Sequence, residues 1–261
     1  MIRKNEKGEN EIALINIFES INGEAYASGK PAVFIRTFGC NLRCQFPCDT
    51  QECWSIQNML KVYPERASWK DPFKWMTAKE IFDEVEEIEK NYYHKSICLT
   101  GGEPLLEINK EFMINELIPL FVNAHYDVGI ETDGGVDYSD YKKKFGDSKI
   151  INGNGDREGV TIIADYKLPC SGMTKFMIQS NLDLYSDMDV LKMVISDNEE
   201  DWKELDRILT TNTKASIFLS PCFGKVTMNR IPEYVIKHAD KPIRAQIQAH
   251  KIFWSPTAKD K

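Results

Sequence analysis

Short apolar segments rich in β-branched residues alternate along this chain with longer segments in which apolar residues recur at helical spacing. Short apolar runs bounded by turn residues are typical of buried strands, and the longer periodic segments are typical of amphipathic helices. The pattern predicts strands at Ile12–Phe18, Ala32–Phe38, Ser96–Thr100, Val128–Glu131, Thr161–Asp165, Val190–Ile195, Ala215–Leu219 and Ile243–Gln248. It predicts helices at Ala78–Tyr92, Glu111–Asn123, Glu199–Leu209 and Arg230–His238.

The first predicted helix has a clear start and a buried face. Thr77 and Glu80 form a capping box, in which each side chain satisfies a free backbone amide of the other residue. Apolar residues then follow at helical spacing and mark the buried side: Ile81, Phe82, Val85 and Ile88. The glutamates of the same segment predict a solvated acidic face: Glu84, Glu86, Glu87 and Glu89.

Strands that alternate with helices predict βαβ units, a parallel sheet and right-handed crossovers. With 261 residues, no internal repeat and no shift in composition, the chain is expected to form one domain over residues 1–261. Gln51–Pro72 is predicted to be a long irregular segment, and such loops commonly bind ligands. Most of the candidate ligand-binding residues follow the carboxyl ends of predicted strands, where parallel sheets and barrels place their ligands.

Composition and charge exclude several classes of protein. Hydrophobic residues make up 42% of the chain and aromatic residues 11%, enough for a core, which argues against global disorder. The 33 basic and 40 acidic residues give a net charge of −7, which argues against general nucleic-acid binding. No apolar run approaches the length of a membrane span, and the polar N-terminus does not resemble a signal peptide. A cytoplasmic protein without a membrane partner is therefore expected.

Three of the 7 cysteines, Cys40, Cys44 and Cys48, lie within one short segment. In a reducing compartment such a cluster favours metal binding over disulfides. Three thiolates can hold three irons of a four-iron cluster and leave the fourth iron free for a ligand that is not protein. Two alternatives stay open: a zinc site completed by His94 or Cys53, and a cluster held by Cys44, Cys48 and Cys53. The scattered cysteines are predicted to be buried or half-buried thiols: Cys53, Cys98, Cys170 and Cys222.

The segment Thr100–Pro104, Thr-Gly-Gly-Glu-Pro, follows the third predicted strand. Glycine has no Cβ, so Gly101 and Gly102 let the backbone approach a polar ligand closely, and Glu103 places an acceptor beside it. The simpler alternative is a strand-to-loop turn. Combined with the three cysteines, the segment indicates a redox-active iron bound by a cofactor that carries an amino-acid group.

Together the two motifs resemble the signature of the radical S-adenosylmethionine superfamily, C-x3-C-x2-C followed by Gly-Gly-Glu. This chain departs from the signature by one residue, because Pro47 stands between Phe46 and Cys48. The resemblance implies an α/β fold, a partial (β/α) barrel with the cluster loop, residues 39–75, at its C-terminal mouth. It also implies a [4Fe-4S] cluster and S-adenosylmethionine, whose reductive cleavage gives a 5′-deoxyadenosyl radical that abstracts hydrogen from the substrate.

Further segments resemble one family of this superfamily, the 7-carboxy-7-deazaguanine synthases of queuosine (7-deazapurine) biosynthesis. The matching segments are Glu19–Glu24, Gly29–Pro31, Phe34–Arg36, Cys48–Thr50, Glu131–Gly134, Asp165–Gly172, Leu219–Pro221 and Gln248–Trp254. Asn22 stands where the family typically has glutamine, which keeps an amide. The resemblance implies a lyase that converts 6-carboxy-5,6,7,8-tetrahydropterin to 7-carboxy-7-deazaguanine with loss of ammonia, and that also uses Mg²⁺.

The resemblance implies roles for individual residues. Cys40, Cys44 and Cys48 are expected to ligate the cluster, Thr50 to ligate Mg²⁺, and Arg36 to bind the substrate carboxylate with its two-pronged guanidinium. The other expected substrate contacts are Ile21, Asn22, Gly23, Glu24 and Thr100. The expected contacts to S-adenosylmethionine are Gly101, Gly102, Glu103, Thr132, Asp165, Tyr166, Lys167, Ser220, Pro221, Cys222 and Phe223. No further residue is assigned a catalytic role.

Simpler alternatives accompany these assignments. Arg36 could form a surface ion pair, Thr50 could hydrogen-bond its own turn, and Lys167 could be solvated. His250 is interpreted as a structural histidine and left out of the site. For the whole protein, the alternatives are another small radical enzyme, such as an activase for a glycyl-radical enzyme, and a non-catalytic iron-sulfur or zinc module. The resemblance also implies a flavodoxin or ferredoxin as electron donor and a homodimer.

Overall fold

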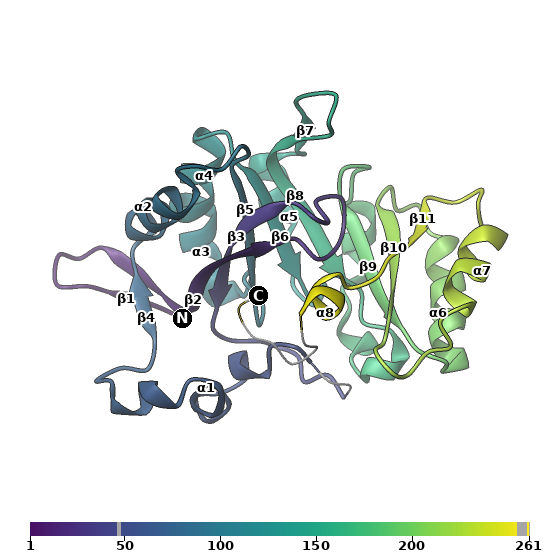
Figure 1. Ribbon diagram of the computed structural model, residues 1–261, viewed down its shortest axis with the longest axis horizontal. Coiled ribbons are helices and arrows are strands. Elements are labelled where there is room, and N and C mark those ends of the chain that lie inside the picture. Colours follow the sequence, from purple (N-terminus) through teal and green to yellow (C-terminus); the bar gives the residue numbers. More distant parts are fainter. Residues whose placement is uncertain (46–47, 255–259, 261) are drawn as a thin grey trace.

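A computed structural model describes residues 1–45, 48–254 and 260 of the chain. Its strands form one continuous sheet in the order β1-β2-β3-β5-β6-β8-β9-β10-β11 (Figure 1). From β3 to β11 all neighbours in this order run parallel. The bounds are β3 (Pro31–Thr37), β5 (Ser96–Gly101), β6 (Asp127–Thr132), β8 (Arg157–Asp165), β9 (Val190–Ile195), β10 (Ser216–Pro221) and β11 (Ile243–Ala245). This open parallel sheet confirms the predicted α/β class and partial barrel.

The N-terminal edge of the sheet is antiparallel, so the prediction of parallel pairing was wrong there. β2 (Asn10–Ile21) runs antiparallel to β3, and β1 (Ile2–Lys4) and β4 (Lys74–Met76) both pair antiparallel with β2. The connection from β2 to β3 is too short for a crossover helix. It is closed by two backbone hydrogen bonds of 2.8 Å between Asn22 and the segment Gly29–Lys30. A further short strand, β7 (Lys149–Ile150), pairs antiparallel with β8.

All four predicted helices form, and the first begins with the predicted capping box. The Glu80 amide donates to Thr77 Oγ1 at 3.2 Å, and the Thr77 amide donates to Glu80 Oε2 at 2.9 Å. The second predicted helix is interrupted by a wide π-helical turn at Met113–Leu117, just before Pro119, which has no amide hydrogen for the normal helical bond. The helices are α2 (Ala78–Glu89), α3 (Lys110–Phe112), α4 (Ile118–Asn123), α5 (Ser139–Phe145), α6 (Glu199–Leu209), α7 (Arg230–Lys237) and α8 (His250–Phe253).

Part of the segment predicted to be irregular, Gln51–Pro72, is helical. Ser55 caps α1 (Ile56–Val62) by accepting the Asn58 amide at 3.2 Å, a signal that the sequence contains. The helix packs Met59 with Cys53 against β2, in a small separate core. Single 3-10 turns form at Gln51–Cys53, Pro64–Ser68, Glu107–Asn109, Pro169–Ser171, Thr174–Phe176 and Gln179–Asp183. The long segment is therefore a packed helical excursion beside the cysteine loop.

The two faces of the parallel sheet have different surroundings, because successive side chains of a strand point to opposite sides. On β3, Ile35 packs in the main core under the helices, whereas its neighbour Arg36 lines a cavity on the other face. On β9, Leu191 packs in the core and Lys192 lines the cavity. The residues that join α2, α4 and α6 to the core face of the sheet include Ile81, Val85, Phe121, Leu205 and Ile208. Hydrophobic packing on one face thus directs the charged residues of the other face into the cavity.

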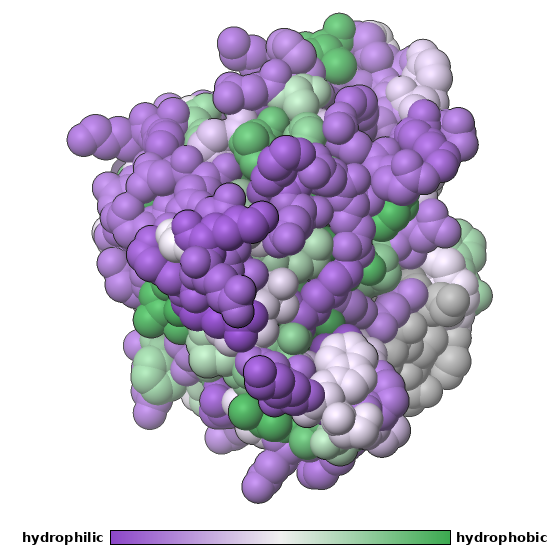
Figure 2. All heavy atoms as spheres, turned by 90° about the vertical axis from the view of Figure 1, so that its left-hand side faces the viewer, coloured by the Kyte–Doolittle hydropathy of each residue, from purple (hydrophilic) through white to green (hydrophobic). Residues whose placement is uncertain are grey.

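The β1–β4 edge of the sheet presents a largely hydrophilic surface, with hydrophobic side chains scattered singly or in small groups (Figure 2). Arg3 on β1 pairs with Glu11 at 2.8 Å, and Lys74 on β4 pairs with Glu84 at 2.6 Å. Charged side chains along a sheet edge discourage its pairing with other chains. No described helix has both the length and the apolar character needed to cross a membrane.

Glu89 corrects the expectation of a solvated acidic face on α2, because its side chain is buried at the end of the helix. Its Oε1 accepts the Ser96 amide at 3.2 Å, at the start of β5. Its Oε2 is buried and has no hydrogen-bond partner among the described residues. Burial raises the pKa of Glu89 to about 7, and the hydrogen bond from Ser96 opposes this only in part.

We expect Glu89→Gln to remove a pH-dependent loss of stability. The folded-state pKa of Glu89 lies above its ordinary value. In the parent, the stabilisation linked to this carboxyl group is therefore fully present below pH about 4.5 and is lost as the pH rises through about 7. The free energy of unfolding should fall by roughly 1–3 kcal/mol over this range. Glutamine stays uncharged, so chemical denaturation should show Glu89→Gln gaining stability over the parent between pH 5 and 8. Glu86→Gln, an exposed change on the same helix, should show no such gain, and equal pH profiles for the three proteins would contradict the assignment.

Candidate functional site

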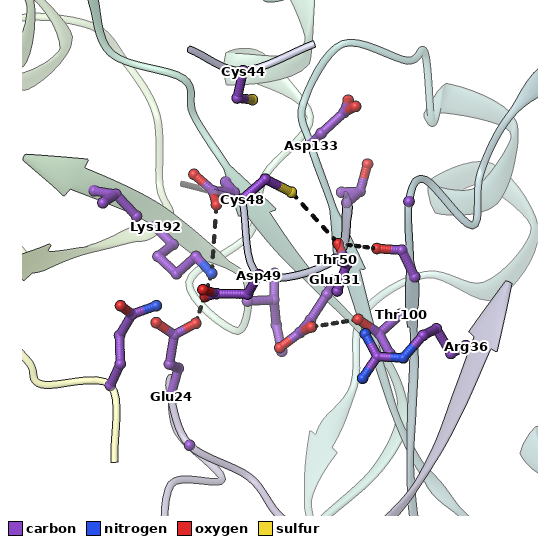
Figure 3. Close-up of a pocket in the computed structure, with 18 of the residues that line it drawn as sticks. Glu24, Arg36, Cys44, Cys48, Asp49, Thr50, Thr100, Glu131, Asp133 and Lys192 are labelled. Carbon is purple, nitrogen blue, oxygen red and sulfur yellow. Dashed lines mark hydrogen bonds and ion pairs between the residues drawn. The ribbon is translucent and has the colours of Figure 1, made fainter. Parts of the chain in front are cut away.

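A cavity of about 520 Å³ lies on the inner face of the sheet and collects most of the predicted site residues (Figure 3). It is lined by side chains of β3, β6, β8 and β9 and by the loops that follow β3, β5, β6, β8 and β10. These loops leave the carboxyl ends of parallel strands, the usual ligand position in such sheets. The cavity is therefore the candidate active site.

Cys40, Cys44 and Cys48 all line this cavity, whereas Cys53 is buried in the small core beside α1. Burial, with a contribution from Asp133, raises the pKa of the Cys40 thiol to about 12. Burial also raises the pKa of Cys44 to about 11, against an opposing effect of Lys167. Thiols in such surroundings become thiolates only when a metal ion compensates the charge.

The donor set fits an iron-sulfur cluster in its chemistry, since three thiols of one loop face one cavity. Within residues 1–45, 48–254 and 260, no three histidine, cysteine or carboxylate side chains are close enough together to hold one metal ion. Cluster ligation by the three cysteines stays a prediction. Phe46 and the inserted Pro47 lie outside the described residues.

Gly101 and Gly102 bring the loop after β5 into contact with the loop after β3. Gly101 has a φ of +135°, and a Cβ there would lie 2.4 Å from the Thr37 carbonyl oxygen. A Cβ on Gly102 would lie 2.0 Å from the Gly39 carbonyl oxygen and 2.9 Å from Cys40 Cβ. Only glycine permits this approach. Both glycines line the cavity, so they serve the loop packing and expose backbone to a ligand at the same time.

Glu103 is fully buried beneath the loops and is satisfied by the protein itself. Its Oε2 accepts from Thr132 Oγ1 at 2.9 Å and from the Asp133 amide at 2.6 Å, and its Oε1 accepts the Leu105 amide at 2.8 Å. Burial and the nearby Asp133 carboxylate raise its pKa. The side chain therefore braces the ends of β5 and β6, and its predicted contact with S-adenosylmethionine stays a prediction.

The other predicted cofactor contacts divide between the cavity wall and the layer behind it. Asp165 and Lys167 line the cavity and form an ion pair of 2.9 Å, so Lys167 is not a solvated surface residue. Thr132, Cys222 and Phe223 also line the cavity. The Tyr166 hydroxyl instead donates to Glu204 at 2.6 Å on α6. Ser220 and Pro221 are buried at the end of β10, behind the lining.

Arg36 lies at the cavity rather than on the surface. Its side chain is 10% exposed, and its guanidinium lies 5.0 Å from the centre of the Phe18 ring. The Nη2 atom is 3.8 Å from a carboxylate oxygen of Asp260. The Nε atom is buried without a hydrogen-bond partner in the described part of the chain. Because Arg36 lines the cavity, this donor is available to an acceptor of a ligand bound there.

Most of the other predicted substrate residues share this wall. Ile21, Gly23, Glu24 and Thr100 line the main cavity, and Thr100 Oγ1 donates to Glu131 at 2.7 Å. Asn22 lies apart from them and lines a small neighbouring cavity. Its backbone amide and carbonyl oxygen are both used by hydrogen bonds that close the connection between β2 and β3.

Thr50, the expected magnesium ligand, also lines the cavity. Its hydroxyl donates to the Gly101 carbonyl oxygen at 3.1 Å and lies 3.7 Å from Cys48 Sγ. It therefore bonds across to the end of β5 instead of to its own turn. Because the hydrogen of the hydroxyl is used in this bond, its oxygen lone pairs are left for a cation or another donor.

Sequence reasoning did not assign six charged residues that line the cavity in the described chain: Asp49, Glu131, Asp133, Lys192, Lys251 and Asp260. Figure 3 labels Asp49, Glu131, Asp133 and Lys192. Glu131 and Lys192 are charged residues within otherwise apolar strands, and this was the available signal. Lys192 Nζ lies 2.6 Å from Glu24 Oε2 and 3.5 Å from Asp165 Oδ2. His250 is part of α8, but its side chain lies outside the described structure.

Comparisons with known proteins identify the family of this chain. Residues 34–150 match the Radical SAM superfamily. The chain is 33% identical to a 7-carboxy-7-deazaguanine synthase of Clostridium acetobutylicum, over 93% of this chain and 96% of that protein. It is 31% identical to a protein of the same name from Methanospirillum hungatei, over 93% and 86% of the two chains.

A solved structure supports the same fold. The crystal structure of QueE from Escherichia coli matches with a TM-score of 0.61 at 20% identity and covers 92% of this chain and 95% of that chain. At this identity the match establishes the fold alone. The near full-length sequence matches show that this chain belongs to the 7-carboxy-7-deazaguanine synthase family of the radical SAM superfamily.

Proposed function

We propose that this chain is a radical S-adenosylmethionine lyase that converts 6-carboxy-5,6,7,8-tetrahydropterin to 7-carboxy-7-deazaguanine with release of ammonia. The observation that carries the proposal is the meeting of two features in one cavity. Three cysteine thiols stand at one wall, and Arg36, with a buried and unpaired Nε, stands at another. Family membership supports the same reaction, because the relatives named above are 7-carboxy-7-deazaguanine synthases.

Cys40, Cys44 and Cys48 would hold the [4Fe-4S] cluster. When bound, the cluster and S-adenosylmethionine supply the electron and the 5′-deoxyadenosyl radical that removes hydrogen from the substrate. The chain's own part is to bind and orient the two molecules. The backbone of Gly101 and Gly102 is open to a polar group, and the wall formed by Asp165, Lys167 and Cys222 would hold the rest of the cofactor.

The substrate would lie on the opposite wall. Arg36 offers a planar donor pair to its carboxylate, which suits a guanidinium better than an ammonium group. Glu24 and the backbone of Ile21 and Gly23 face the space that the pterin ring would occupy, and their acceptors suit its N–H groups. Thr100, held by Glu131, would contact the ring from the loop side. No residue is given a proton-transfer role.

Thr50 would bind Mg²⁺ between the cluster loop and the substrate. Its position at the cavity and the free lone pairs of its hydroxyl support this role. A neutral hydroxyl is a weak ligand, and magnesium commonly keeps several waters and takes oxygens from the substrate. The site would therefore be complete only when substrate is present.

The reaction also needs a one-electron donor, for which a flavodoxin or ferredoxin is proposed.

We also propose that the protein forms a homodimer and acts in the cytoplasm. All seven cysteines are free thiols in the structure, as expected in a reducing compartment. The single domain over residues 1–261 is supported by the continuous sheet.

The two rival functions make different demands on the cavity. An activase for a glycyl-radical enzyme acts on a protein backbone and gives no role to the unpaired Nε of Arg36. A non-catalytic iron-sulfur or zinc module gives no role to either Arg36 or the charged wall of Glu24 and Lys192. Such a module also predicts metal content without cleavage of S-adenosylmethionine.

The decisive experiment is anaerobic reconstitution with iron and sulfide, followed by dithionite, S-adenosylmethionine and carboxytetrahydropterin. We expect 5′-deoxyadenosine and 7-carboxy-7-deazaguanine, measured by liquid chromatography and mass spectrometry. Cys40→Ala, Cys44→Ala and Cys48→Ala should each lose the brown chromophore and all product, because each thiol would ligate one iron. Cys53→Ala is the matched control and should keep both. Loss of the chromophore in Cys53→Ala but not in Cys40→Ala would overturn the assigned ligands.

Arg36→Lys should weaken substrate binding more than cofactor binding. Lysine keeps the charge but loses the two-pronged geometry, and disruption of a buried charge-assisted pair typically costs about 2–5 kcal/mol, or roughly thirty-fold and upward in affinity. The measurement is equilibrium binding of 6-carboxypterin, the unreactive aromatic analogue, beside that of S-adenosylmethionine. Arg66→Lys removes a buried arginine that bonds the Ile15 carbonyl oxygen outside the cavity, and it should leave both affinities unchanged. Parent-like binding of 6-carboxypterin by Arg36→Lys and Arg36→Ala would exclude the carboxylate role.

Thr50→Val should blunt the stimulation of turnover by Mg²⁺ while the cluster remains intact. Valine has a similar shape but lacks the oxygen that would bind the ion. Titration of MgCl₂ against the rate of product formation, with iron content as a check, measures the effect. Thr161→Val, which removes a buried hydroxyl bonded to Ser148, is the control and should respond to Mg²⁺ like the parent. A full magnesium response in Thr50→Val, or tight Mg²⁺ binding by the substrate-free parent, would refute the assignment.

A further inference from the structure

Four charged side chains form an alternating row along the cavity wall. Glu24 Oε2 lies 2.6 Å from Lys192 Nζ, Lys192 Nζ lies 3.5 Å from Asp165 Oδ2, and the same Asp165 oxygen lies 2.9 Å from Lys167 Nζ. Glu24 comes from the turn after β2, Lys192 from β9, and Asp165 and Lys167 from the end of β8. Figure 3 shows the side chains of Lys192 and Glu24 directed toward one another. Lys192 therefore joins a segment at the substrate side of the site to a segment at the cofactor side.

Lys192 is a fixed cation rather than a base. Its side chain is 12% exposed and those of Glu24 and Asp165 are 7% and 18% exposed. Burial by itself would lower the pKa of Lys192, but the carboxylates of Glu24, Asp165 and Glu131 outweigh it and raise the pKa well above its ordinary value. The pKa of Asp165 is lowered in spite of its burial, because Lys167 and Lys192 stabilise the carboxylate. Mutual attraction therefore holds Lys192 and Asp165 in their charged forms, and the 2.6 Å contact ties Glu24 to the same ammonium group.

The remaining oxygens of the two carboxylates differ in their partners. Ser220 Oγ donates to Glu24 Oε1 at 3.5 Å and is itself held by Gln246 Nε2 at 2.8 Å. Gln246 also accepts the Ala25 amide at 2.9 Å, so the backbone next to Glu24 is fixed by the same residue. Asp165 Oδ1 is buried and has no hydrogen-bond partner among the described residues. Lys192 thus contacts one oxygen of each carboxylate, and the second oxygen of Asp165 is the one left without a partner in the described chain.

We propose that Lys192 is a positioning residue that sets the distance and orientation between the substrate acceptor Glu24 and the cofactor acceptor Asp165. The proposal rests on the function proposed above. Lys192 keeps two like charges together on one wall and so aligns the pterin with the carbon that takes its hydrogen. A displacement of about 1 Å between reacting groups can cost roughly 100-fold in rate. A radical formed without an aligned substrate is quenched by other hydrogen donors, so misalignment consumes cofactor without product.

A purely structural role for Lys192 makes a different prediction. Buried ion pairs contribute little net stability compared with apolar residues of similar size, but removal of one partner destabilises the fold. A structural lysine would therefore affect unfolding temperature without changing the ratio of cofactor consumed to product formed. Lys142 provides the matched case. Its side chain is 11% exposed and pairs with the buried Asp189 at 2.6 Å, and it does not line the cavity.

The test compares Lys192→Met, Lys192→Arg and Lys142→Met. The first readout is equilibrium binding of 6-carboxypterin to reconstituted, unreduced protein, which requires no turnover. The second is the ratio of 5′-deoxyadenosine to 7-carboxy-7-deazaguanine in the full reaction. We expect Lys192→Met to weaken 6-carboxypterin binding by roughly 10- to 100-fold and to raise the ratio several-fold. Lys192→Arg should bind 6-carboxypterin more tightly than Lys192→Met and have a ratio closer to that of the parent. Lys142→Met should change only the unfolding temperature.

Parent-like probe affinity and product ratio in Lys192→Met would overturn the proposal. Should Lys192→Met fail to fold, Lys192→Gln provides the same information, because it removes the charge that holds both carboxylates and keeps a polar side chain. It should weaken 6-carboxypterin binding and raise the ratio, and parent-like values would equally overturn the proposal. If the parent itself forms no product from carboxytetrahydropterin, the proposed function is overturned instead. The variants therefore test the role of Lys192, and the parent reaction tests the proposed function.

Discussion

The alternation of side chains along the parallel strands is the constraint on which the rest of the structure depends. In β3 and β9 the apolar members, such as Ile35 and Leu191, pack beneath the helices, and their neighbours Arg36 and Lys192 point into the cavity. A shift of one residue in register would exchange the two sets, because the side-chain period of a strand is two. Burial of the apolar set is worth about 1.5–3 kcal/mol for each large side chain. The core therefore keeps the charged residues directed at the ligand site.

The inner face in turn carries an unusual amount of buried charge. Removing an ionised group from water is costly unless an opposite charge and hydrogen bonds compensate it. The row of Glu24, Lys192, Asp165 and Lys167 meets this condition with two charges of each sign. Arg36 is less completely compensated, since its Nε has no partner in the described chain. A fold that only required stability would place apolar residues at these positions, so their presence agrees with a site for a polar, charged substrate.

The loops at the carboxyl ends of the strands are tied to one another by hydrogen bonds of the protein itself. Glu103 binds the ends of β5 and β6 together, and its own amide donates to the Gly39 carbonyl oxygen at 2.8 Å, next to Cys40. The close contact of Gly102 with the same loop leaves no room for a side chain. The position of the first cysteine thus depends on the glycine-glycine-glutamate segment. The two motifs act as one structural unit, although about sixty residues separate them in the sequence.

Much of the fold and the chemical identity of the site were determined by the sequence itself. Apolar periodicity located the parallel strands and the main helices, and the cysteine and glycine motifs indicated the cofactor, because these signals are local. The antiparallel start of the sheet, the helix α1 within Gln51–Pro72 and the burial of Glu89 were not predicted, since they depend on which segments pack together. Tertiary structure alone placed Asn22 outside the main cavity and Glu103 beneath it. It also brought Lys192 of β9 next to Glu24 and Asp165. Lys192 and Glu24 are 168 positions apart in the sequence, so their contact depends on how the sheet closes and not on any local sequence pattern.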